Sequence, residues 1–221
     1  MTLVTYEDIR NNEEFRTYIE MGDKHLGVLG YTKHDFGHVG KVADTASKIL
    51  EELGYSRREV ELAKIAGYIH DIGNMVNRDE HAQTGACLSF NILNRLGMDP
   101  QEIALVVSAV GNHDEGTGNP INPISAALIL GDKADVRRSR VRNNDFATFD
   151  IHDRVNYAVE KAVVTVDGEE RTVQLDLVID TTICSIMEYF EIFINRMILC
   201  RKAADFLYSE FQLTINGAKI V

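Results

Sequence analysis

Residues 65–73 read Ile65-Ala66-Gly67-Tyr68-Ile69-His70-Asp71-Ile72-Gly73. The apolar residues on both sides of the His-Asp pair predict the end of a buried helix, and Gly73 is a typical residue to terminate it. The same dipeptide occurs at 34–35 and at 152–153, but only the pair at 70–71 follows an apolar helical segment. We therefore expect His70 and Asp71 to lie in the interior, where an imidazole and a carboxylate can ligate a metal ion.

Helical periodicity extends from this segment over most of the first 145 residues. Ser56 and Glu59 form a capping box at the start of the same helix. Asp99 before Pro100 indicates a further helix start, because an N-cap is followed by proline at the first helical position. We expect helices at about 11–29 (with Asn11 and Glu14 as a capping pair), 35–53, 56–73, 79–96, 99–112 and 122–140.

The pattern changes after residue 155. Residues 162–166 and 171–179 are rich in β-branched residues and partly alternate in polarity, with Asp167-Gly168 between them, which predicts a β-hairpin. A long apolar helix is expected at about 182–209, and a short strand or hairpin around Asn216-Gly217. The predicted fold is mainly α. A helical core (1–155) and a region with a small β-hairpin and a long C-terminal helix (156–221) are expected to form one compact domain.

Composition limits the classes of function. The 221 residues include 34 acidic and 23 basic side chains, so the formal net charge is −11. A chain this acidic is a poor binder of nucleic-acid polymers and of anionic membranes. No stretch is apolar enough for a transmembrane helix, and the N-terminus lacks the layout of a signal peptide. The three cysteines (Cys87, Cys184 and Cys200) are widely spaced, as expected for reduced thiols in a cytoplasmic protein.

Six side chains on or beside different predicted helices are candidate metal ligands: His38, His70, Asp71, His81, His113 and Asp132. Imidazoles and carboxylates together suit iron, manganese, zinc or nickel better than calcium or magnesium. Six ligands exceed the need of one tetrahedral zinc ion. With one carboxylate bridging, they can hold two ions, the arrangement used for phosphoryl chemistry. A single histidine at a helix end is more often structural, so the prediction rests on the whole set.

Three segments carry four of these residues: His38-Val39-Gly40-Lys41-Val42-Ala43, Ala66-Gly67-Tyr68-Ile69-His70-Asp71-Ile72-Gly73 and Leu128-Ile129-Leu130-Gly131-Asp132. In their sequence and in their order along the chain, these segments resemble the metal-dependent phosphohydrolases of the HD-domain superfamily. His81 and His113 resemble the additional ligands of members that bind two metal ions. The resemblance covers about residues 34–140 and implies the all-helical HD-domain bundle.

The match to the HD-GYP branch, which cleaves cyclic dinucleotides, is poor. Asn112 stands before His113, Asn74 follows Gly73, and the expected Gly-Tyr-Pro triplet reads Gly118-Asn119-Pro120. The segments are closer to bacterial HD hydrolases of dinucleoside polyphosphates, although nothing in the sequence indicates a nucleoside pocket.

The resemblance implies a role for each ligand. Asp71 is expected to bridge two ions and to orient the attacking water. The other ligands divide between the ions, with His38, His70 and Asp132 on one and His81 and His113 on the other. One or two divalent ions, iron or manganese before zinc or nickel, lower the pKa of water and neutralise phosphoryl charge. The implied activity is hydrolysis of a phosphate ester or anhydride of a nucleotide or another small phosphorylated metabolite.

Two other functions stay open. A few HD-fold enzymes use a similar six-ligand set as di-iron oxygenases that act on a small polyol or phosphonate. A degenerate HD module acting in signalling or binding is the third reading, but such modules usually lack the ligands that this chain retains.

Four further residues are candidates for holding the substrate or supporting a ligand. Arg140 comes eight residues after Asp132, so a helix through both places them near one face, where a guanidinium can hold phosphate. A solvated helix C-terminus is the competing interpretation. His34 and Lys133 are also candidate substrate binders. Asp135 is expected to share a helical face with Asp132 and is a candidate to orient a metal ligand. The expected partner is a small phosphorylated molecule, and the apolar stripe of the C-terminal helix suits the core or a homodimer.

Overall fold

Side-chain caps begin several helices where the sequence predicts them. The computed structural model describes residues 3–221. Ser56 and Glu59 form a capping box, and Asp35, Asp99 and Asn122 each accept hydrogen bonds from the first turn of a helix. Because these caps satisfy amide groups that have no partner within the helix, they fix where each helix starts.

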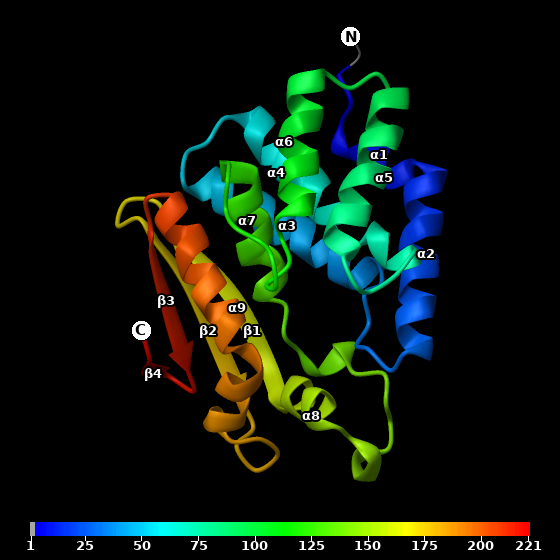
Figure 1. The fold of residues 1–221 in the computed structure, drawn as a ribbon. Coiled ribbons are helices and arrows are strands. Elements are labelled where there is room, and N and C mark those ends of the chain that lie inside the picture. Colours follow the sequence, from blue (N-terminus) through cyan, green and yellow to red (C-terminus); the bar gives the residue numbers. More distant parts are fainter. Residues whose placement is uncertain (1–2) are drawn as a thin grey trace.

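Figure 1 shows the arrangement of the helices and strands within the described residues. The helices are α1 (Tyr6–Asn11), α2 (Glu13–Val28), α3 (Phe36–Glu52), α4 (Arg57–Ile69), α5 (His81–Arg95), α6 (Pro100–Gly111), α7 (Pro123–Lys133), α8 (Ile151–Ala158) and α9 (Ile186–Phe206). The strands are β1 (Val159–Asp167), β2 (Thr172–Ile179), β3 (Glu210–Ile215) and β4 (Ala218–Lys219). The mainly helical fold, the hairpin and the long C-terminal helix are as predicted.

Several helix boundaries differ from the prediction. The helix expected at 11–29 begins at Glu13, because Asn12 rather than Asn11 adopts an extended conformation and caps α2 through the amides of Glu14 and Phe15. The short helix α1 before it was not predicted. The helix expected at 56–73 ends at Ile69, and a 3-10 helix follows at Ile72–Met75. The helix expected to reach residue 140 ends at Lys133. The sequence analysis did not predict α8, which Asp150 caps.

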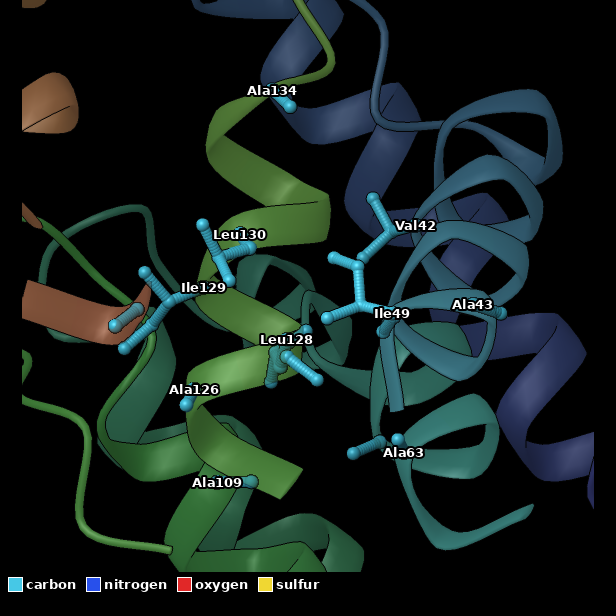
Figure 2. Close-up of a cluster of buried hydrophobic side chains, with 14 of the residues drawn as sticks. Val42, Ala43, Ile49, Ala63, Ala109, Ala126, Leu128, Ile129, Leu130 and Ala134 are labelled. Carbon is cyan, nitrogen blue, oxygen red and sulfur yellow. The ribbon is translucent and has the colours of Figure 1, made fainter. Parts of the chain in front are cut away.

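The bundle core lies where α3, α4 and α7 meet (Figure 2). Val42, Ile49 and Leu128 are fully buried there. At Gly67 the helices α3 and α4 approach so closely that an added Cβ atom would lie 2.7 Å from Ala43 Cα. This approach holds the end of α4 against the first half of α3.

The C-terminal part of the chain forms one four-stranded sheet in the order β1-β2-β3-β4. The β1–β2 hairpin and the β3–β4 pair are antiparallel, whereas β2 and β3 are parallel. Two parallel neighbours need a crossover connection, and α9 provides it. Because α9 packs on α7 as well as on the sheet, it lies beside one of the helices that carry candidate ligands (Figure 1).

Candidate metal centre

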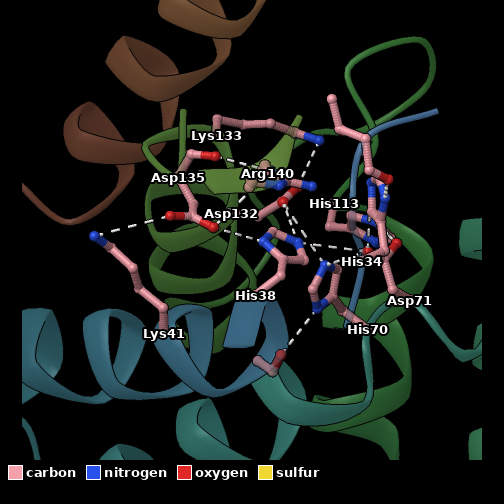
Figure 3. Close-up of polar contacts among 12 residues, drawn as sticks. His34, His38, Lys41, His70, Asp71, His113, Asp132, Lys133, Asp135 and Arg140 are labelled. Atoms are coloured by element: carbon pink, nitrogen blue, oxygen red, sulfur yellow. Dashed lines mark hydrogen bonds and ion pairs between the residues drawn. The ribbon is translucent and has the colours of Figure 1, made fainter. Parts of the chain in front are cut away.

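The six candidate ligands lie close together around Asp71. Figure 3 shows five of them: His38, His70, Asp71, His113 and Asp132. The six come from the first turn of α3, the turn after α4, the start of α5, the residues after α6 and the last turn of α7: His38, His70 and Asp71, His81, His113 and Asp132. All six are buried, and the most exposed of them, Asp132, is only 9% accessible. The structure therefore brings together every residue that the sequence analysis singled out as a metal ligand.

Asp71 lies at the centre of this cluster. Its Oδ2 atom is 3.5 Å from His38 Nε2 and 3.1 Å from His70 Nε2. Its Oδ1 atom is 3.5 Å from His81 Nε2 and 3.9 Å from His113 Nε2. The two oxygens of one carboxylate thus face two different pairs of imidazole nitrogens, as a carboxylate between two cations must.

Asp132 adds a second carboxylate on the Oδ2 side of Asp71. Its Oδ1 atom is 3.4 Å from His38 Nε2 and 3.7 Å from His70 Nε2. Two imidazole nitrogens and two carboxylate oxygens therefore surround one point, whereas the other side of Asp71 offers the two nitrogens of His81 and His113.

The second ring nitrogen of each histidine is already bonded. Three of them pair Nδ1 with the backbone carbonyl three residues earlier: His70 with Gly67 at 2.9 Å, His81 with Arg78 at 2.9 Å and His113 with Val110 at 2.6 Å. His38 Nδ1 lies 2.8 Å from the Asp135 carboxylate. Because a carbonyl or a carboxylate can only accept, each Nδ1 atom carries a proton. In the neutral form of each ring, which is the form that binds a metal ion, the lone pair of Nε2 therefore points into the cluster.

The candidate ligands fit a metal ion, because several of their buried nitrogen and oxygen atoms have no hydrogen-bond partner. Among the described residues, His38 Nε2, His70 Nε2 and Asp71 Oδ2 are buried without a hydrogen-bond partner. His81 Nε2 and His113 Nε2 lie 3.2 Å apart, although both present lone pairs. A buried lone pair that faces no hydrogen-bond donor raises the free energy of the folded protein. A cation that is shared between these atoms removes this unfavourable contribution. The nitrogen and oxygen donors suit a divalent transition metal.

The electrostatics of the cluster favour positive charge between the carboxylates. Burial alone lowers the pKa of His70, but Asp71 and Asp132 more than offset it and raise the pKa to about 10. Burial raises the pKa of Asp71, yet His70 and His34 hold it well below its usual range. Both carboxylates therefore stay ionised at neutral pH and attract a cation.

Asp135 contacts His38 from beyond the end of α7. Its Oδ2 atom accepts the His38 Nδ1 proton, and its Oδ1 atom accepts a hydrogen bond of 2.8 Å from Arg137 Nε. Lys41 Nζ lies 3.8 Å from the same oxygen. The predicted contact with a ligand is present, but the reason given for it was wrong, because α7 ends before Asp135 and the two aspartates share no helical face.

Arg140 also reaches the centre by a route other than the predicted one. It lies in a separate 3-10 turn (Arg138–Arg140), so its place does not follow from a helix shared with Asp132. Its guanidinium donates to two backbone carbonyl groups and lines a small hollow beside the cluster. His34 lines the same hollow, with Nε2 4.0 Å from Asp71 Oδ2.

Lys133 is held in buried ion pairs. Its Nζ atom is 2.7 Å from Asp132 Oδ2 and 2.8 Å from Glu115 Oε2. Burial lowers the pKa of Lys133, but Asp132 and Glu115 more than offset this and raise it. The ammonium group thus neutralises Asp132, and its role as a substrate binder stays a prediction.

Three charged residues beside the cluster were missed from the sequence: Arg78, Glu115 and Arg196. Arg78 Nη1 lies 3.4 Å from His81 Nε2. Arg196 of α9 donates from Nε to Glu115 Oε1 at 3.0 Å, and both arginines line the hollow at the cluster. No motif surrounds these residues. The one available signal was a lone arginine between Phe193 and Met197 on a largely apolar helix.

A helical bundle that brings histidines and aspartates together from successive helices is typical of metal-binding proteins. Comparison with known proteins finds one family model that matches this bundle. The family model of the HD domain matches residues 35–141. Residues 35–141 therefore form an HD domain, as the motifs in this part of the chain indicated.

Two curated proteins are similar in sequence. The uncharacterized protein MJ1020 of Methanocaldococcus jannaschii is 25% identical over 198 residues, which cover 79% of this chain and 75% of that protein. Ribonuclease Y of Opitutus terrae is 30% identical over 155 residues, which cover 67% of this chain but only 27% of that enzyme. The chain thus spans about a quarter of the length of the ribonuclease.

Among solved structures, a predicted HD superfamily hydrolase from an uncultured Thermotogales bacterium aligns with a TM-score of 0.45 and 23% identity, over 56% of this chain and 67% of that one.

None of the helices in residues 3–221 has the length and apolar character needed to cross a membrane.

Proposed function

We propose that this protein is a metal-dependent phosphohydrolase that cleaves a phosphate ester or anhydride of a nucleotide or another small phosphorylated metabolite. The observation that carries the proposal is the placement of Asp71, whose two oxygens face two sets of buried imidazole nitrogens. Divalent ions held there, iron or manganese before zinc or nickel, lower the pKa of water and neutralise charge on a phosphoryl group.

The residues around the cluster support a phosphorylated substrate. Arg78, Arg140 and Arg196 line the hollow that contains Asp71 and Asp132. Guanidinium groups suit phosphoryl oxygens, because their N–H groups can donate in pairs to two oxygens at once. In this proposal the carboxylates and imidazoles hold the ions, and the arginines orient the substrate.

A small substrate is favoured over a nucleic-acid polymer. The formal net charge of −11 opposes binding of a long polyanion. One relative is named a ribonuclease, but the chain spans only 27% of it. RNA therefore belongs in the substrate screen as a competing outcome, and we expect no cleavage of it.

The test combines metal analysis with a screen for phosphate release. Purified protein is analysed for iron, manganese, zinc and nickel. It is then assayed with added manganese, by phosphate release from mononucleotides and sugar phosphates and by chromatography of the products from dinucleotides and RNA. We expect bound transition metal and phosphate release from at least one small ester, and we expect Asp71→Asn to lose both. Asp205→Asn, which changes an exposed carboxylate at the end of α9, is the matched control and should lose neither.

Two outcomes would contradict the proposal. Full activity and full metal content in Asp71→Asn would remove the assigned site. Two irons per chain, oxygen uptake with a polyol or phosphonate and no phosphate release from any ester would support the di-iron oxygenase instead.

A further inference from the structure

A cavity of about 490 Å³ lies beside the metal cluster, and most of its wall comes from outside residues 35–141. Tyr31 and His34 line it from the segment between α2 and α3. Helices α8 and α9 supply the opposite part of the wall, through residues such as Asp153 and Phe193. The volume is suited to a nucleotide or a sugar phosphate.

Three arginines lie at the inner end of this cavity, together with Glu115, which pairs with one of them. Arg78, Arg140 and Arg196 line both the cavity and the small hollow at the metal cluster. Protein contacts hold each guanidinium in place: Arg196 donates from Nε to Glu115, and Arg140 donates from Nε and Nη1 to backbone carbonyls. Guanidinium groups fixed in this way are suited to bind a phosphate that enters toward the cluster.

The outer end is rich in hydrogen-bond acceptors and carries negative charge. Asp150, Asp153 and Asn156 line the cavity but not the hollow at the cluster. The Asp153 carboxylate has one long hydrogen bond of 3.4 Å, from Asn143. Asn156 is 6% exposed, and because its Nδ2 donates to the His152 carbonyl at 2.8 Å, its Oδ1 is the atom available to a ligand.

We propose that this two-ended cavity selects small molecules with a single phosphate, and that Asp153 determines the selection. The phosphate lies between the arginines, and hydroxyl or amino groups at the other end of the substrate donate hydrogen bonds to Asp153 and Asn156. A second phosphate at that end meets the carboxylates of Asp150 and Asp153, so like-charge repulsion excludes it. The inference rests on the proposed function and narrows its substrates from phosphorylated metabolites in general to monophosphates with a polar, uncharged or cationic remainder.

The inference is tested by calorimetric binding of two matched ligands to the manganese-loaded full chain. The ligands are phosphonate analogues of glucose 6-phosphate and glucose 1,6-bisphosphate, in which a methylene group replaces each ester oxygen. We expect the wild-type protein to bind the monophosphonate about tenfold more tightly, since like charges at close range cost more than 1.4 kcal/mol, or one factor of ten.

Asp153→Asn removes the charge but keeps the size of the side chain, and it avoids Asp150, which caps α8. This variant is expected to reduce the preference to about threefold or less, as half of the outer charge is lost. Glu191→Gln makes the same change of charge at an exposed position of α9 outside the cavity and should keep the wild-type ratio.

Equal affinities in the wild-type protein, or an unchanged ratio in a folded Asp153→Asn variant, would overturn the inference. The ligands cannot be hydrolysed, so the result does not depend on turnover. The protein could also prefer the monophosphonate and yet release phosphate from no substrate. That result would contradict the proposed function but would still support the assignment of the cavity.

Discussion

Asp71 must hold its carboxylate in a fixed plane if its two oxygens are to serve two cations. The turn after α4 provides part of this constraint, and Asn74 provides the rest. Asn74 Nδ2 donates both to Asp71 Oδ1 at 2.9 Å and to the Asp71 carbonyl at 3.0 Å. A polar side chain three residues after Asp71 therefore orients its carboxylate.

Asp135 is the residue whose support of a ligand is easiest to measure. Asp135→Asn keeps the shape but removes the charge that accepts the His38 Nδ1 proton at 2.8 Å. We expect metal affinity to fall about 10- to 100-fold, because a carboxylate behind a ligating imidazole fixes its tautomer and raises its basicity. Competition with a chromogenic chelator measures the affinity, and an unchanged value in the folded variant would contradict this role.

The sequence predicted single residues unevenly. The six candidate ligands were singled out because histidine and aspartate in an ordered series resemble a known family. Arg140 was singled out for a wrong reason, since it reaches the centre from a 3-10 turn and not from α7. Arg196 was missed because its contact is long-range, as its 3.0 Å bond with Glu115 illustrates. Arg78 was missed although it lies only three residues before His81.

The crossing of α3 and α4 is the contact between elements on which the centre depends. At Gly67 an added Cβ atom would lie 2.7 Å from Ala43 Cα and 2.8 Å from Ala43 N, both of them backbone atoms that cannot swing away. We expect Gly67→Ala to lower the free energy of unfolding by about 1–3 kcal/mol, as overpacking does elsewhere. Urea unfolding measures it.

Gly40 provides the matched control on α3, because an added Cβ atom there meets nothing within 4 Å. Gly40→Ala should raise the free energy of unfolding by about 0.5–1 kcal/mol, since alanine has the better helix propensity. If both variants had the same stability, the tight crossing would not be real.

Helix α9 lies outside the segment that matches the HD domain, yet it carries Arg196 into the hollow at the cluster. We expect Arg196→Gln to raise KM for a small phosphate ester about tenfold, as loss of a charged hydrogen bond costs about 1.5–3 kcal/mol. Metal content should not change. Arg201→Gln, exposed on the same helix, should match the wild-type protein, and a matching KM in Arg196→Gln would exclude this contact from substrate binding.

Elements with local signals were predicted best. Caps and a turn sequence located α4, α6 and the β1–β2 hairpin. The end of α7 was not predicted, because no glycine or proline marks it. There the chain leaves the helix after Lys133, and Asp135 bonds to His38, a residue 97 positions away. A long-range contact of this kind leaves no local pattern.

At the scale of the whole molecule, the metal centre joins α3, α4, α5 and α7 with the segment after α6, so its occupation should stabilise the entire bundle. An ion at 100 times its Kd adds about 2.7 kcal/mol to the free energy of unfolding. For a chain of this length we expect the midpoint of thermal unfolding to fall roughly 5–10 °C on chelation and to recover with manganese. Differential scanning calorimetry measures this change, and a midpoint insensitive to chelator would contradict a centre that links these helices.

Anomalous X-ray diffraction from crystals of the manganese-loaded protein shows whether Asp71 lies between two metal ions. We expect two anomalous peaks. One adjoins Asp71 Oδ2, close to His38, His70 and Asp132, and the other adjoins Asp71 Oδ1, close to His81 and His113. The absence of any peak in the cluster, or peaks that leave Asp71 uncoordinated, would contradict this placement of Asp71.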